Sequence, residues 1–207
     1  MALTIQENIS ITYGRGEAIA HNLEKMIGQQ DLSPDLPDLI NRFGAICLDV
    51  ESGPEIRGLI GFKPKSLTLT EPGGRHEEEH PFDDLNGQII KGVSDRCQLP
   101  INLVRKHPIS ALDQIVAEKP IAQVGLITFL NAFPDDQTSN YLTALAKSAA
   151  PLLVDGGQLI ISTVEDDVYT AERLEKAQEL MAVCGLSAKL IEKDYGCAGH
   201  LFIICQK

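Results

Sequence analysis

The sequence predicts an α/β protein with a mostly parallel sheet between two layers of helices. Short apolar runs alternate with segments of helical periodicity five times along the chain. Runs such as 45–50 and 124–130 are apolar almost throughout, which is typical of strands buried on both faces. The last two strand-like runs, 186–196 and 199–207, leave no room for a crossover helix and should pair as an antiparallel hairpin. The expected architecture is a three-layer sandwich around a seven-stranded sheet that ends in this antiparallel C-terminal hairpin.

The other elements follow from periodicity and turn residues. Further strands are expected at 66–71, 101–106 and 156–164, and helices at 16–30, 54–61, 82–98, 110–119, 138–153 and 170–185. The strand at 156–164 should begin after a Gly-Gly turn. Residues 31–38, DLSPDLPD, are polar and contain two prolines, so we expect a link there. Residues 1–40 are interpreted as an N-terminal helical cap segment and 41–207 as the α/β domain, within a single domain overall.

Composition and charge exclude several kinds of partner. The net charge of −11 repels phosphate backbones, and the nearest basic cluster, Arg105 to His107, is too small to offset it. No apolar run reaches the roughly 20 residues of a membrane span, and the first ten residues lack the regions of a signal peptide. Five scattered cysteines without a CxxC pair favour free thiols in a reducing cytoplasm. We therefore expect a cytoplasmic protein with a small-molecule substrate, and a homo- or hetero-oligomer stays open.

Four segments resemble, in order, the motifs of the class I S-adenosylmethionine-dependent methyltransferases. They are LDVESGP (48–54), LTLTEP (67–72), LITFLNAFP (126–134) and LLVDGGQLIIS (152–162). The resemblance runs from about residue 40 to 207, and the fourth segment is the one close to a signature. It implies a Rossmann-like seven-stranded sheet with a reversed final strand, S-adenosylmethionine as cofactor, and methyl transfer catalysed mainly by positioning.

The candidate cofactor residues lie where open α/β sheets bind their ligands, at the carboxyl ends of strands. Asp49, Glu71 and Asn131 all fall at predicted strand ends. The resemblance implies that Glu71 accepts bonds from ribose hydroxyls and that Asn131 faces the substrate. It further implies that Gly53 lies in the cofactor loop and that Arg15, within YGRG, binds the carboxylate of the cofactor.

The first motif departs from the family pattern. Three glycines would fall at 51, 53 and 55, but only Gly53 is kept, with Glu51 and Glu55 at the other two positions. Glycine serves where φ is positive or where a ligand presses on the backbone. A buried, unpaired carboxylate at Glu51 would be costly, although it could pair with the ammonium group of the cofactor. This degenerate glycine motif makes Glu51 the cofactor-site residue that decides whether the cofactor binds.

The sequence is therefore compatible with two functions. The first is an S-adenosylmethionine-dependent methyltransferase acting on a small molecule. The second is a catalytically inactive methyltransferase-like protein, a pseudoenzyme, acting as a partner or scaffold subunit. The sequence does not define a catalytic residue, and Asn131 and His107 are the candidates. A different reaction on the same fold is a third option, whereas the lack of G-x-G-x-x-G disfavours a nicotinamide dehydrogenase.

One further motif resembles a metal site. HEEEH, from His76 to His80, matches the H-E-x-x-H pattern of zinc metalloproteases. That pattern needs both histidines on one face of a stable helix. Gly73, Gly74 and Pro81 flank these residues closely, so we expect a solvated acidic loop and no metal site.

Overall fold

The seven-stranded sheet predicted from the sequence is present and mostly parallel. The computed structural model describes residues 32–48, 59, 62–71, 85–118, 123–129, 138–164, 171–194 and 199–207. Its strands are β1 (Ala45–Leu48), β2 (Leu67–Thr70), β3 (Ile101–Val104), β4 (Val124–Phe129), β5 (Leu153–Val164), β6 (Ser187–Asp194) and β7 (Gly199–Gln206). Their order in the sheet is β3-β2-β1-β4-β5-β7-β6. Strand β7 runs antiparallel to both β5 and β6, which confirms the C-terminal hairpin.

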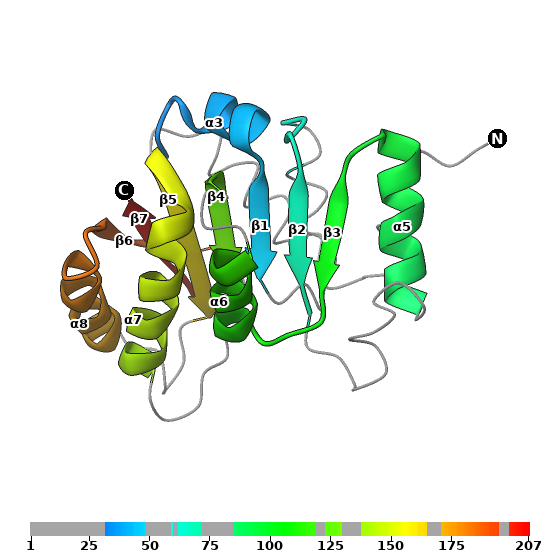
Figure 1. Cartoon of the computed structure of the whole chain (residues 1–207). Coiled ribbons are helices and arrows are strands. Elements are labelled where there is room, and N and C mark those ends of the chain that lie inside the picture. The colour runs from blue at the N-terminus through cyan, green and yellow to red at the C-terminus, as the bar shows by residue number, and fades with distance from the viewer. Residues whose placement is uncertain are drawn as a thin grey trace.

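Helices cover both faces of this sheet, as Figure 1 shows. They are α3 (Leu36–Phe43), α5 (Leu85–Cys97), α6 (Pro108–Glu118), α7 (Thr138–Ala149), the short 3₁₀ helix η1 (Ala150–Leu152) and α8 (Ala171–Ala182). Side chains of α3 and α5 share one apolar cluster with one face of the sheet. Side chains of α6, α7 and α8 share a second cluster with the opposite face. Within the described residues, no helix is long and apolar enough to cross a bilayer.

Helix α3 replaces part of the link expected at residues 31–38, so that prediction was wrong. The helix begins at Leu36 and contains Pro37 in its first turn, where a missing N–H costs nothing. Leu36 and Ile40, four residues apart on one face, are both fully buried. Burial of this face stabilises a helix whose local composition resembles a loop. The boundary drawn at residue 40 falls inside α3, and the cap segment up to residue 31 lies outside the described residues.

Strand β5 starts three residues earlier than expected and runs through the Gly-Gly pair. Val124 of β4 pairs with Leu153, whereas Leu126 pairs with Gln158, so the ladder contains an irregularity between these two positions. Gly156 lies within it at a φ of +79°, a conformation that favours glycine. Its N–H donates to the carbonyl of Lys207 at 3.0 Å. The pair is therefore a bulge inside the strand rather than a turn before it.

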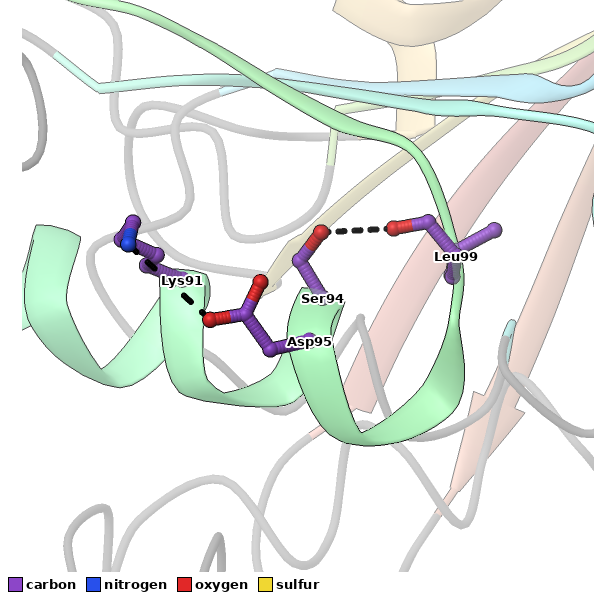
Figure 2. A network of polar contacts seen from close by, with 4 residues as sticks. All are labelled: Lys91, Ser94, Asp95 and Leu99. Carbon is purple, nitrogen blue, oxygen red and sulfur yellow. Dashed lines mark hydrogen bonds and ion pairs between the residues drawn. The ribbon is translucent and has the colours of Figure 1, made fainter.

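The end of α5 sets the path into the edge strand β3. Gln98 adopts a positive φ of 50°, and the N–H of Leu99 donates to the carbonyl of Ser94 at 3.2 Å. This is the Schellman arrangement that ends many helices. Figure 2 shows a second bond, in which the Ser94 hydroxyl donates to the Leu99 carbonyl at 2.7 Å. Two bonds between the same residues hold the turn that starts β3.

Four of the five cysteines lie within the described residues, and two of these belong to the core. Cys47 and Cys205 are fully buried, while Cys97 and Cys184 are half-buried. Burial raises the pKa of Cys205 to about 12, with a further contribution from Cys184. The Cys205 thiol lies 3.2 Å from the sulfur of Met181. Cys47 and Cys205 therefore act as small apolar residues.

Candidate cofactor site

The strand order places a topological switch point between β1 and β4. From β1 the chain moves to β2 and β3 on one side, and then returns to β4 and β5 on the other. Leu48 of β1 and Phe129 of β4 lie side by side at the carboxyl edge of the sheet. Crossovers that diverge in this way leave a crevice at the carboxyl ends, where open α/β sheets bind ligands.

A buried ion pair lies at this same edge, one strand away from the switch point. The Nη1 atom of Arg105 donates to the Oε2 atom of Glu71 at 2.6 Å. The Arg105 side chain is 2% exposed and that of Glu71 is 11% exposed. A charge buried this deeply needs a partner, because an unpaired ion in the interior costs several kcal/mol. The pair therefore makes two buried charges tolerable at the end of β2 and β3.

Strand register brings these two residues together. Thr70 of β2 and Val104 of β3 are paired neighbours, so the next residue of each strand, Glu71 and Arg105, leaves the sheet at the same level. The N–H of Glu71 donates to the carbonyl of Val104 at 3.1 Å, which extends the ladder past Thr70. The N–H of Lys106 donates to the same carbonyl at 3.0 Å and turns the chain out of β3.

Glu71 is where the sequence predicted it, at a strand end on the ligand-binding edge. A carboxylate offers about four acceptor positions, so the Arg105 contact at Oε2 is compatible with bonds from ribose hydroxyls. The guanidinium also fixes the direction of the carboxylate. The described residues at this edge thus fit the ribose-binding role that the family resemblance implies.

His107 lies near this pair but is exposed to solvent. It directly precedes α6, and its carbonyl accepts the N–H of Ala111 at 2.9 Å. The remaining candidate residues lie outside the described residues, and their roles stay predictions: Arg15, Asp49, Glu51, Gly53 and Asn131. His76 to His80 also lie outside them. Among the residues that the structure does describe, no three His, Cys, Asp or Glu side chains are grouped to hold a metal ion.

Arg105 is a candidate site residue that no sequence motif indicated. It was noted only as part of a small basic cluster with Lys106 and His107. The sequence signal for Arg105 is its position directly after the apolar run 101–104, which a helix follows. This run comes next in the chain after the strand that ends in Glu71. In a parallel sheet, residues that follow consecutive neighbouring strands meet at one edge.

Comparison with solved structures identifies the fold. The magnesium protoporphyrin IX methyltransferase from Synechocystis PCC 6803, solved with bound S-adenosylmethionine, is 9% identical with a TM-score of 0.58, covering 100% of this chain and 86% of that one. A methyltransferase from Pyrococcus furiosus is 16% identical with a TM-score of 0.52, covering 78% and 73%. Fibrillarin from Aeropyrum pernix, with natively bound S-adenosylmethionine, is 15% identical with a TM-score of 0.52, covering 78% and 65%. The chain has the class I methyltransferase fold.

Sequence comparison adds no closer relative. No protein-family model matches the chain. No curated protein matches it significantly either. The likeness therefore lies in the three-dimensional arrangement of the elements.

Proposed function

We propose that this protein is an S-adenosylmethionine-dependent methyltransferase that acts on a small molecule. The observation that carries the proposal is the buried Glu71 carboxylate, held by Arg105 at the carboxyl end of β2. It lies beside the switch point of a fold shared with structures that hold S-adenosylmethionine. The net charge of −11 favours a small acceptor over a nucleic acid.

Each residue of the proposed site has a positioning role. When bound, S-adenosylmethionine supplies an electrophilic methyl group on a sulfonium. Glu71 accepts hydrogen bonds from the ribose hydroxyls, and Arg105 keeps its carboxylate in place. Asp49 and Gly53 complete the cofactor loop after β1, and Asn131 faces the acceptor. Catalysis then consists of holding the acceptor in line with the methyl group, which needs little acid-base chemistry.

A scaffold role without methyl transfer is the second candidate function. The observation that favours it is the pair of glutamates, Glu51 and Glu55, at two of the three motif glycine positions. A glutamate side chain takes space that a glycine leaves for the ligand. Both candidate functions share one fold, so cofactor binding is the property that separates them.

The test is a calorimetric titration of S-adenosylhomocysteine into the native protein and three variants. We expect micromolar binding by the native protein and a loss of about tenfold or more in Glu71→Gln, because a neutral amide accepts weaker bonds than a carboxylate. Asp95→Asn, which changes an exposed carboxylate of α5, is the matched control and should bind like the native protein. Binding that appears only in Glu51→Gly supports the scaffold role. Equal binding by Glu71→Gln and the native protein contradicts the assigned role of Glu71.

A further inference from the structure

A cavity lies on the α6 face of the sheet and extends to Arg105, the residue that holds Glu71. The cavity has a volume of about 440 Å³. It is lined by Lys65 and Ser66 before β2, by residues of β1 to β3, and by the second half of α6. Glu118 at the end of α6 and Gln123 before β4 lie at its amino-terminal end. Arg105 and Lys106, directly after β3, lie at its carboxyl end.

The sheet surface inside this cavity changes from apolar to polar toward the edge strand. Ile46, Thr68 and Asn102 are neighbours across β1, β2 and β3, and neighbouring residues of parallel strands point to the same face. Ile46 is fully buried, Thr68 half-buried and Asn102 exposed. Figure 1 shows α6 and α7 side by side over one part of the sheet and β2 and β3 beside them.

The opposite face of the same strands is apolar throughout. The next residues along, Cys47, Leu69 and Leu103, are neighbours as well, and all three are buried in the cluster that α5 covers. Strands of parallel sheets are usually apolar on both faces because helices cover both. On the other face, β2 carries Thr68 and Thr70, whereas β3 carries Asn102 and the apolar Val104, so this face is partly polar.

The charges and hydrogen-bonding groups of the cavity indicate what it would bind. Lys65 and Lys106 both line it, although the chain as a whole carries a net charge of −11. The Nε2 atom of Gln114 donates to Oε1 of Glu118 at 2.6 Å, which fixes the orientation of the amide. The Oε1 atom of Gln114 is then buried without a donor. A buried acceptor without a partner is unfavourable, so a ligand that supplies a donor to it binds more tightly.

We propose that this cavity is a binding site for a small organic anion that carries hydroxyl groups. Lys65 and Lys106 attract the anion from the two ends of the cavity, and a hydroxyl donates to Oε1 of Gln114. Thr68 and Asn102 offer further donors and acceptors from the sheet. The volume lies within the roughly 300–1,000 Å³ of small-molecule sites. The cavity borders the cofactor site, because Arg105, which holds Glu71, is one of its lining residues.

The test uses ribose 5-phosphate as the probe. Ribose, which lacks the charged group, and inorganic phosphate, which lacks the sugar hydroxyls, are the two comparison ligands. Calorimetry should show ribose 5-phosphate binding at least about tenfold more tightly than either half, because both kinds of contact are made at once. Lys65→Gln/Lys106→Gln should weaken this binding about tenfold or more. Gln114→Leu should weaken ribose 5-phosphate binding and leave phosphate binding unchanged. Lys91→Gln, at an exposed lysine of α5, should bind like the native protein.

Two further outcomes would overturn the proposal. The first is no binding of ribose 5-phosphate at about 10 mM, or equal binding by the native protein and the double lysine variant. The second is displacement of ribose 5-phosphate by S-adenosylhomocysteine, which would place the probe in the cofactor site. The variants change exposed or half-buried side chains, and matching circular dichroism spectra will verify that they fold.

Discussion

Arg105 and Glu71 lie 34 residues apart in the sequence and form a buried ion pair, with 2.6 Å between Nη1 and Oε2. The pair joins the ends of β2 and β3 at the edge where ligands bind in this fold. It couples stability to the proposed function, because the carboxylate that would bind ribose is also one half of an internal salt bridge.

Arg105→Met should lower the free energy of unfolding by about 3 kcal/mol, because it leaves the Glu71 carboxylate buried without its cation. Lys91→Met is the matched control. It removes a cation from the exposed pair with Asp95, whose atoms are 4.0 Å apart, and should cost less than about 0.5 kcal/mol. Urea unfolding measures both. The double variant Arg105→Met/Glu71→Leu should recover most of the loss, and equal losses in the two single variants would contradict a buried pair.

Gly125→Ala should destabilise the protein by about 3 kcal/mol or more, because overpacking against backbone cannot relax by a rotamer change. A Cβ atom at this position would lie 2.5 Å from the backbone carbon of Leu39 and 2.8 Å from the nitrogen of Ile40. Glycine at 125 therefore lets α3 approach β4. Gly92→Ala in α5 meets nothing within 4 Å and should instead stabilise by about 0.5–1 kcal/mol. Thermal unfolding that moves both variants in the same direction would refute this contrast.

Gln98→Gly should stabilise the protein by about 1 kcal/mol, because a positive φ strains every residue that has a Cβ atom. Gln88→Gly, at an exposed position inside α5, should cost about 1 kcal/mol or more, since glycine adds flexibility to the unfolded chain and removes the interactions of the Gln88 side chain. Urea midpoints compare the two substitutions directly. Destabilisation by both would mean that the turn after α5 does not hold its left-handed residue in solution.

Cys205 should make the protein less stable at alkaline pH. Its pKa rises from 9.0 to about 12 on folding, because burial disfavours the thiolate. The stabilising contribution is complete below pH 9 and is lost as the pH rises toward 12, because only the unfolded chain releases the proton in that window.

The measurement compares native protein with Cys205→Ala, so that other titrating groups cancel. Between pH 8 and pH 10 the stability advantage of the native protein should shrink by about 1.4 kcal/mol. If the difference in free energy of unfolding between the two proteins stays constant with pH, the thiol is as accessible to water in the folded state as in the unfolded chain.

The sequence by itself determined the class of fold and the order of its elements. Apolar runs such as the one from Val124 to Phe129, alternating with helical periodicity, predict a parallel sheet, because both signals depend on local spacing alone. The short connection between β6 and β7 likewise required an antiparallel hairpin. The position of Glu71 at a strand end also followed from local sequence, and with it a candidate ligand site.

Only the tertiary structure decided which residues meet and which faces are covered. The helix at Leu36 forms because its apolar face is buried, and the Gly-Gly pair lies inside β5 because β4 and Lys207 pair around it. Arg105 became the partner of Glu71 through strand register, which no local pattern specifies. The polar face of Thr68 and Asn102 became a cavity because α6 ends beside it. These outcomes depend on contacts between distant segments, and such contacts exist only once the sheet has assembled.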